Sequence, residues 1–342
     1  GANNLSGLSF GGGTPSNTAA TEEWSFSGVQ PTDVANYANA ITGDFYYNSS
    51  TGQFKTVNDG GAPIGTWASG GNMNTARYNA GRGTAGTQSA GIASGGSHPG
   101  FANTEQYNGT AWTEVNDLNT ARGRSASCAT SYTAVVIGGG YGPSNATTAN
   151  SESFDGSSWT EVNNLNTARY AFAGAGTQTA GLAFGGDPGA VTNNESWNGT
   201  SWTEVNDLNE GAGGNSGAGT QTAAFLVYHT QHEQWDGSSW TELAELNTSR
   251  THMASAGITT SALTFGGENP AGSSRLTNTE FWNGSSWTEV NDLATGTYFN
   301  AGAGTSSLAL SYTGDPTSPP APMALTEEFT AADFSIKSVT TS

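Results

Sequence analysis

A short pattern that recurs five times along the chain limits the folds open to it. A Glu is followed two positions later by an aromatic residue, then by Asn-Gly or Asp-Gly, and seven positions after the Glu by Trp. The five copies begin at Glu105, Glu152, Glu195, Glu233 and Glu280 and end at Trp112, Trp159, Trp202, Trp240 and Trp287. Self-similarity at an interval of about 20–50 residues indicates a repeat architecture. The repeat therefore has to be explained before any site is sought.

Each repeat reads as four short strands separated by turn residues. In the copy that ends at Trp202, the expected strands span 170–176, 179–185, 193–197 and 201–205. The Asn-Gly or Asp-Gly pair predicts a tight hairpin between the last two strands, because both central residues of a type I′ turn need φ > 0. The Gly and Ala of the first two strands suit the crowded centre of radially packed sheets. Four-stranded antiparallel sheets repeated about four to eight times describe a β-propeller, so the predicted fold class is all-β.

Further residues of the repeat resemble the kelch repeat. They are a diglycine after the second strand, the Glu-x-aromatic of the third strand, the Trp of the fourth and an Arg ten residues after that Trp. The diglycines are Gly11-Gly12, Gly95-Gly96, Gly138-Gly139, Gly185-Gly186 and Gly266-Gly267. The resemblance implies a kelch-like β-propeller over most of the chain. A WD-type propeller is the structural alternative, but Trp235-Asp236 lacks the accompanying Gly-His signature.

Counting the repeats predicts a ring of seven blades. The first blade is expected to be built from the N-terminal segment, with strands at 5–12 and 21–24 and its outer strand at Trp67, and to be incomplete because its innermost strand is missing. Phe334 occupies the Trp position of the last blade. The expected domains are a single closed ring of 1–28 and 66–342, and an insertion at 29–65.

The insertion contains an expected aromatic hairpin at 44–57, with Tyr46, Tyr47 and Phe54 as a candidate contact surface. This segment resembles segments of bacteriophage tail and virion proteins. The sequence motifs Asn-Thr-Ala-Arg at 166–169 and Gly-Thr-Gln-Thr-Ala at 176–180 are similar to motifs in propeller proteins of marine bacteriophages. The resemblance implies a virion or extracellular location and a place in a homo-oligomer or larger assembly. Its expected partners are other virion proteins or a host surface glycan.

The charge of the chain excludes some classes of partner. Its net charge is −19, from 28 acidic and 9 basic residues, which disfavours nucleic acid and anionic membrane surfaces. No stretch approaches the ~18 apolar residues of a membrane span, so we expect no membrane insertion. The single Cys128 lies in a run of small residues, where a buried thiol is expected rather than a nucleophile.

Four arginines share one position of the repeat: Arg77, Arg122, Arg169 and Arg250. One interpretation is a ring of cations around the mouth of the propeller channel, which would bind an anionic glycan or phosphate. The other is a set of structural ion pairs with the Glu of the third strand, at Glu105, Glu152, Glu195 and Glu280. The Arg and the Glu recur at the same two positions of the repeat, which favours the ion pairs, because a buried guanidinium needs a carboxylate partner.

Two patterns suggest metal sites, and each has a structural interpretation that we favour. His229 and His232 could form half of a zinc site, but His98 and His252 have no spacing that completes it. Paired acids that follow the Trp positions suggest either calcium sites or a solvated rim; they are Glu114/Asp117, Glu204/Asp207, Glu242/Glu245 and Glu289/Asp292. Calcium needs about six to eight converging oxygens, which this spacing does not supply.

Two further resemblances point to enzymes. The segment from Ser153 to Trp159 resembles the Asp box of sialidase propellers, although it is one residue short between Asp and Gly. That box is itself a structural hairpin, and the repeated arginines do not form the asymmetric triad that a sialidase needs. Kelch-type copper radical oxidases require a Cys joined to a Tyr, and no His lies near Cys128 in the sequence. We therefore expect no catalytic residues, no metal site and no cofactor.

The uniformity of the repeat favours a non-enzymatic virion or extracellular protein with a structural or adhesive role, because a catalytic site breaks the symmetry of a repeat. The alternative is a carbohydrate-binding or carbohydrate-active propeller that uses the variable loops at 97–103, 141–150 and 268–277. An asymmetric cluster of His, Asp and Tyr at one channel mouth would favour an enzyme.

Overall fold

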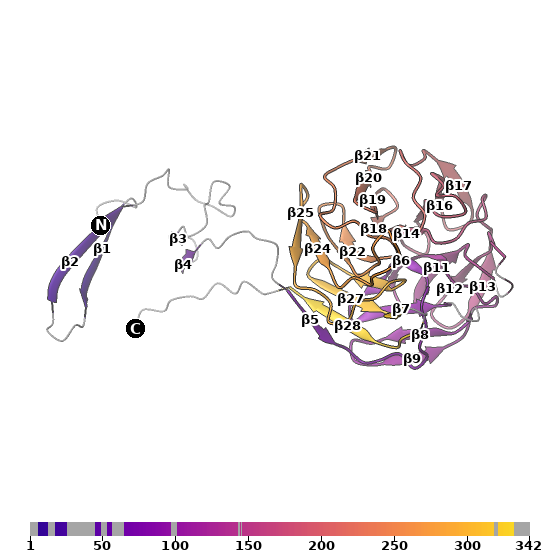
Figure 1. Ribbon diagram of the computed structural model, residues 1–342, viewed down its shortest axis with the longest axis horizontal. Coiled ribbons are helices and arrows are strands. Elements are labelled where there is room, and N and C mark those ends of the chain that lie inside the picture. Colours follow the sequence, from indigo (N-terminus) through magenta and orange to yellow (C-terminus); the bar gives the residue numbers. More distant parts are fainter. Residues whose placement is uncertain are drawn as a thin grey trace. The chain divides into compact units, whose positions relative to one another are not determined.

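The computed structural model describes residues 65–331, except 97–100, 143, 145 and 318–320, together with the backbone of four strands nearer the N-terminus. The chain divides into two compact units, Ala62–Ala332 and a smaller unit of Gly1–Gly61 with Asp333–Ser342. The larger unit is all-β and has the arrangement of a β-propeller (Figure 1).

The larger unit is built from six four-stranded antiparallel units, of which the first two are joined by a parallel pair of their first strands into one eight-stranded sheet (Figure 1). We call each four-stranded unit a sheet; the first strands of the six sheets contact one another at the axis. In order along the chain, the sheets are β6 (Arg82–Thr87), β7 (Ala90–Ser94), β8 (Thr104–Tyr107) and β9 (Trp112–Val115); β10 (Ala126–Ser131), β11 (Ala134–Gly138), β12 (Ser151–Phe154) and β13 (Trp159–Val162); β14 (Ala173–Gly176), β15 (Gly181–Phe184), β16 (Asn194–Trp197) and β17 (Trp202–Val205); β18 (Ser216–Thr220), β19 (Ala223–Tyr228), β20 (Gln231–Trp235) and β21 (Trp240–Glu242); β22 (Ala254–Ile258), β23 (Ser261–Phe265), β24 (Thr279–Trp282) and β25 (Trp287–Val290); and β26 (Ala301–Gly304), β27 (Leu308–Tyr312), β28 (Thr326–Thr330) and β5 (Thr66–Ser69). The predicted division of each repeat into four strands is confirmed.

Each sheet is graded from small side chains at the axis to large ones at the rim. The innermost strands β14 and β26 both read Ala-Gly-Ala-Gly, because strands that converge on an axis leave little room for side chains. Five outer strands open with a Trp that is only 5–6% exposed. In four sheets the indole N–H donates to the third strand of the preceding sheet; the pairs are Trp67 with Thr279, Trp112 with Thr326, Trp202 with Ser151 and Trp287 with His232. The tryptophans therefore hold neighbouring sheets together.

The ring is closed by a strand from the other end of the unit. Strand β5 pairs antiparallel with β28, and Trp67 lies opposite Phe329. The other sheets place their Trp opposite the aromatic residue of the third strand in the same way, as Trp112 lies opposite Tyr107. The prediction that Trp67 completes a first blade is therefore wrong, because Trp67 fills the Trp position of the last one. Phe334, which the repeat spacing predicts for that position, lies outside the described residues.

Seven blades are not confirmed. The segment expected to supply two strands of a first blade forms a separate two-stranded sheet, in which β1 (Ser6–Gly12) pairs with β2 (Thr18–Ser25). Residues 1–28 belong to the smaller unit, so the expected ring of 1–28 with 66–342 is replaced by a unit that spans Ala62–Ala332. The aromatic hairpin is present as β3 (Phe45–Asn48) paired with β4 (Gln53–Thr56), also in the smaller unit.

The axis of the propeller is filled by β6. This strand pairs in parallel with β10 and contacts the innermost strands of all the other sheets. Its Gly83 lies so close to β14 that an added Cβ would sit 2.1 Å from the carbonyl oxygen of Gly174. The axis is therefore packed with backbone, and a ligand meets the propeller at a mouth and not in an open channel.

In the part of the chain that the structure describes, no helix is long and apolar enough to cross a membrane.

Candidate functional site

Six residues form a closed ring of backbone hydrogen bonds around the axis, just before the innermost strands begin. Each N–H donates to the carbonyl of the equivalent residue in the preceding sheet, at 2.7–3.1 Å. The members are Asn79, Arg124, Ala171, Gly214, His252 and Phe299, and their φ angles lie between 54° and 70°. A left-handed backbone is unfavourable for the five members that are not Gly, and such strain is often found at functional sites. The ring also shows that the propeller closes with six sheets.

The side chains of this ring break the symmetry of the repeat. They stand two residues after the repeated Arg position and include a cation, an imidazole and an aromatic ring, whereas Glu and Trp recur almost unchanged elsewhere. At Gly214 an added Cβ would lie 2.5 Å from Nε2 of His252, so the glycine makes room for the imidazole. The uniformity expected from the sequence therefore does not extend to the axis.

Phe299 lies at the centre of the side-chain cluster. Its ring centroid is 4.1 Å from that of His252 and 4.2 Å from that of Tyr298. The guanidinium carbons of Arg124 and Arg82 lie 4.6 and 5.2 Å from the same ring. Cations over an aromatic face gain electrostatic stabilisation, more so when they are shielded from water. Phe299 thus brings together Arg82, at the start of β6, and Arg124, in the bend just before β10.

A pair of stacked tyrosines forms one side of the cluster. The rings of Tyr141 and Tyr170 are 4.0 Å apart and 25° from parallel, and both side chains are half-buried. Arg124 lies 5.6 and 5.9 Å from their centroids. A hydrogen bond with Tyr141, together with burial, raises the pKa of Tyr170 to about 12. The Tyr170 phenol is therefore neutral at physiological pH, and the pair offers hydroxyl groups beside a cation.

Arg82 lies beneath this layer, at the start of β6. It is 2% exposed, and its nearest acceptors, the carbonyl of Asn215 and the side-chain oxygen of Asn79, are both 3.5 Å away. Its Nε has no partner. Burial lowers the pKa of Arg82 to about 9, so the group still carries its charge at neutral pH. The floor of the cluster is consequently a buried cation with weak hydrogen bonds.

On the other side, three charged or polar groups form a chain. Nδ1 of His252 lies 3.2 Å from Oε1 of Glu268, and Nη1 of Arg275 donates to Oε2 of the same carboxylate at 2.7 Å. The Arg275 guanidinium also lies 3.6 Å over the ring of Tyr298. Burial lowers the pKa of His252 to about 4, although Glu268 opposes the shift. Glu268 is therefore held by Arg275, and His252 is neutral at physiological pH.

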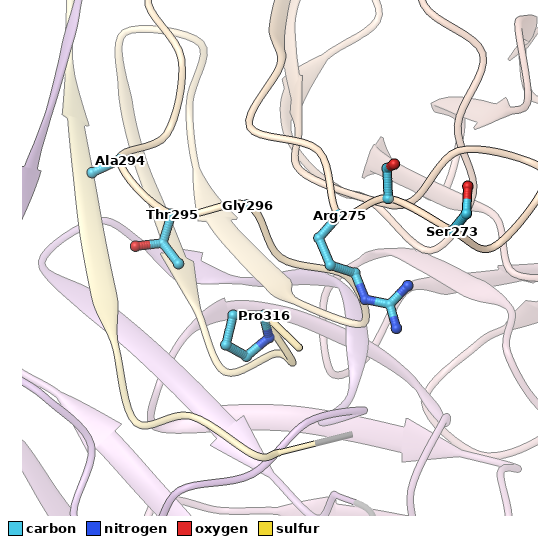
Figure 2. Close-up of a pocket in the computed structure, with 7 residues that line it drawn as sticks. Ser273, Arg275, Ala294, Thr295, Gly296 and Pro316 are labelled. Atoms are coloured by element: carbon cyan, nitrogen blue, oxygen red, sulfur yellow. The ribbon is translucent and has the colours of Figure 1, made fainter. Parts of the chain in front are cut away.

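A hollow of about 540 Å³ adjoins this chain at Arg275. Figure 2 shows that its walls come from three segments, one with Ser273 and Arg275, one with Thr295, and one with Pro316. Hydroxyl groups and backbone dominate these walls. We call the hollow and the cluster together the axial mouth; its members are Arg82, Arg124, Tyr141, Tyr170, His252, Glu268, Arg275, Tyr298 and Phe299 with the residues that line the hollow.

The repeated arginines lie elsewhere. Each is 0% exposed and pairs with the Glu of the third strand of its own sheet; the pairs are Arg77–Glu105 at 2.8 Å, Arg122–Glu152 at 2.5 Å, Arg169–Glu195 at 2.5 Å and Arg250–Glu280 at 2.8 Å. The predicted structural ion pairs are confirmed, and a ring of these cations around the mouth is excluded. The same carboxylates accept backbone N–H groups from the strand connections, as Glu105 does from Asn74 at 2.7 Å.

Other candidates from the sequence have structural roles. His232 is buried, and its Nδ1 accepts the indole N–H of Trp287 at 3.2 Å. Asp155, in the resemblance to an Asp box, accepts the N–H groups of Ser157 and Ser158 at 2.8 Å and closes a hairpin turn. Burial raises the pKa of the Cys128 thiol to about 12, which makes it unreactive.

The acids of the predicted rim bind strand ends, as Glu114 accepts from Asn103 at 2.7 Å and Asp292 from the N–H of Thr279 at 3.1 Å. Within the described ranges no group of three or more His, Cys, Asp or Glu could hold a metal ion. The side chains of Tyr46, Tyr47 and Phe54 lie outside the described residues, so the candidate contact surface stays a prediction.

The repeat does not point to the axial mouth, because the residues of the mouth do not repeat. A signal was present, however. The residue two positions after the repeated Arg position changes from copy to copy while its neighbours recur. The three arginines outside the repeat position, Arg82, Arg124 and Arg275, all lie in the mouth.

Comparisons with known proteins bear on the fold. No protein-family model matches the chain, and no curated protein matches it. The solved structure titled "Structure of YjhT" matches with a TM-score of 0.63 and 12% identity, over 74% of this chain and 95% of that one. At this identity the likeness concerns the fold alone.

Proposed function

We propose that this protein is a non-enzymatic virion or extracellular protein with an adhesive role, and that its propeller binds a glycan at the axial mouth. The kelch character of the repeats, a marine bacteriophage origin, and partners among other virion proteins in a larger assembly are parts of the same proposal. They are supported by the resemblances of the sequence.

The observation that carries the binding role is the break in symmetry at the axis. Away from it, the sheets repeat one set of ion pairs, which explains the repeat by stability alone. At the mouth, stacked tyrosines lie beside Arg124, which has no ion-pair partner among the described residues, and a polar hollow adjoins the cluster at Arg275. A concave site with aromatic surface and a few placed polar groups is typical of small-molecule recognition.

The protonation states in the mouth favour binding over catalysis. A general acid or base works best with a pKa near the working pH. The pKa of His252 falls to about 4 and that of Tyr170 rises to about 12, so both move away from neutrality. Both carboxylate oxygens of Glu268 are engaged within the protein, one by His252 and the other by Arg275. The cluster of His, acid and Tyr is therefore better suited to hold a ligand than to react with it.

A glycan array at near-physiological salt tests the proposal. We expect the wild-type protein to bind a defined set of glycans and to lose them in Tyr141→Ala, which removes half of the stacked pair. Tyr132→Ala, on a turn between the first two strands of the same sheet as Tyr141, is the matched control and should bind like wild type. Absence of glycan binding, or equal loss in both variants, would overturn the role of the mouth.

A purely structural role is the second candidate, and the repetition of the ion pairs favours it. A purely structural role predicts that the protein binds no glycan on the array and is incorporated into virus particles in a fixed number of copies. Quantitative protein analysis of purified particles distinguishes the two roles, because an adhesive protein also binds glycan when isolated.

A further inference from the structure

The basic residues of the propeller are distributed in a way that stability does not explain. The chain has 9 basic residues, and in the described propeller all of them are arginines. Four arginines form the repeated ion pairs. The other three, Arg82, Arg124 and Arg275, all contact Phe299 or Tyr298 at the axis. In a chain with a net charge of −19, this gathering makes the mouth the one part of the described surface where cations converge.

Arg124 is the cation that is available to a ligand. Among the described residues, no carboxylate lies within ion-pair distance of it, whereas Arg275 is engaged by Glu268. Its side chain is half-buried, and three aromatic rings hold the guanidinium at 4.6–5.9 Å. A guanidinium held by its faces keeps its N–H edge for a planar, two-oxygen acceptor. A carboxylate has that shape.

Arg82 adds to the attraction from below. It is buried with an unpartnered Nε and only two contacts of 3.5 Å, so its charge is poorly neutralised by neighbouring groups. The acids nearby have other partners. Asp315 accepts the N–H of Thr317 at 2.9 Å, and Asp187 accepts that of Ala190 at 3.2 Å. An anionic group at Arg124 would therefore also be stabilised by the field of Arg82.

The rest of the mouth suits a pyranose ring. The stacked Tyr141 and Tyr170 offer aromatic surface and phenol groups beside Arg124. Contacts lead from Arg124 through Phe299 and Tyr298 to Arg275, in steps of 4.6, 4.2 and 3.6 Å, and so to the hollow of about 540 Å³. The wall of this hollow is rich in hydroxyl groups, which fits a ligand that itself carries many hydroxyl groups. The site is thus long enough to hold more than the anionic group.

We propose that the axial mouth binds a uronic-acid segment of a glycan, with Arg124 as the anchor of a sugar carboxylate and the Tyr141–Tyr170 pair as the platform for the sugar ring. This inference rests on the proposed function and names the class of glycan. Highly sulfated polymers fit less well, because the remainder of the protein carries a large negative charge.

Isothermal titration with three probes tests the inference. They are tri-galacturonate, its methyl ester, which has the same shape without the charge, and the neutral galactose trimer. We expect wild type to bind the acid at least about tenfold more tightly than the ester, as the loss of a charged hydrogen-bonded pair implies. In Arg124→Gln the acid should weaken about 10- to 100-fold while the ester changes little.

The matched control is Thr110→Asp, which makes the same change in net charge at an exposed turn between β8 and β9. It should bind the acid like wild type, and circular dichroism should show that both variants are folded. Equal binding of acid and ester by wild type overturns the carboxylate anchor. If Arg124→Gln and Thr110→Asp weaken binding of the acid equally, the carboxylate anchor is also ruled out, because the effect then comes from net charge.

The result also separates this inference from the proposed function. If the neutral trimer binds, and Tyr141→Ala abolishes that binding, the mouth is a glycan site but the uronate assignment is wrong. If none of the probes binds and the glycan array is silent, the proposed function itself fails.

Discussion

At the scale of single residues, one position shows how a variation in the repeat creates a pH-sensitive contact. The residue before the repeated Glu accepts the indole N–H of the next sheet, through a hydroxyl at Thr279 and Thr326 and through the imidazole at His232. Nδ1 also lies 3.3 Å from the carbonyl oxygen of Ala244, and it can accept the indole N–H only in the neutral tautomer whose proton is on Nε2. Burial lowers the pKa of His232 to about 4. This histidine therefore resists protonation in the folded state.

We predict that His232→Thr makes the protein less sensitive to acid. The unfolded histidine takes up a proton below pH ~6.5, whereas the folded one does so only near pH 4, so wild type loses stability as pH falls through that interval. Threonine keeps the bond to Trp287 and does not titrate. Urea unfolding at pH 7 and pH 4.5 should show wild type losing about 2–3 kcal/mol more than the variant. An equal loss in both would contradict the assignment.

The axial ring gives a second prediction at this scale. Gly214→Ala should cost at least about 1–2 kcal/mol, because φ is 70° and the new Cβ would collide with His252. Ala171→Gly, at the equivalent position with φ 54°, should change stability by less than about 1 kcal/mol. Urea midpoints measure both effects. Tri-galacturonate binding should weaken only in the first variant, and the opposite order would show that the ring does not shape the mouth.

At the scale of elements, the sixth sheet lacks the ion pair of its neighbours. Thr297 stands where four of the other five sheets have Arg, the fourth sheet having Ala212 there. Among the described residues, Glu327 on β28 accepts the N–H groups of Ala294 and Thr295 and no cation pairs with it. Burial raises the pKa of Glu327. Because the folded state favours the protonated form, this carboxylate lowers stability as pH rises through its folded pKa. The sixth sheet therefore bears a carboxylate without the cation that its neighbours supply.

We predict that the same substitution, Glu→Gln, costs much more stability in the fifth sheet than in the sixth. Glu280→Gln should cost about 3–5 kcal/mol, because it leaves Arg250 buried without a counter-charge. Glu327→Gln should stay within about 1 kcal/mol of wild type, since removing the charge offsets the loss of one backbone hydrogen bond. Chemical unfolding at pH 7 compares them directly. Similar costs would mean that the carboxylate, and not its pairing with Arg, stabilises the sheet.

Elements also show which parts of the structure the sequence could predict. The third and fourth strands were predictable because Glu, Asn-Gly and Trp specify a hairpin and an ion pair within one repeat. The strand that pairs with the Trp67 strand was not predictable, because the spacing of repeats along the chain does not show which end of the chain supplies the strand that closes the ring. The sequence does not single out Arg124, and it suggests His252 only as a zinc ligand, for a different reason. They stand where the repeat changes, and only the fold brings them together at one axis.

At the scale of the whole molecule, stability depends on closing the ring. Six sheets meet through their innermost strands, and the last sheet is complete only when β5 pairs with β28. Without β5, the backbone of β28 would form an unpaired edge, which is prone to pair with other chains. The ring contacts of the partly buried Trp67 with Phe265 and Phe329, at 4.9 and 5.2 Å, would be lost as well. Closure is thus a contact between the two ends of the propeller unit.

This closure predicts that a chain shortened to 62–332 folds by itself and keeps the mouth. We expect it to unfold in one cooperative transition and to bind tri-galacturonate like the full chain. A chain shortened further to 71–332 lacks β5, so it should lose several kcal/mol of stability and tend to associate. Calorimetry and light scattering distinguish the two. If 62–332 instead unfolded as readily as 71–332, the segment before residue 62 would have to contribute a seventh blade after all.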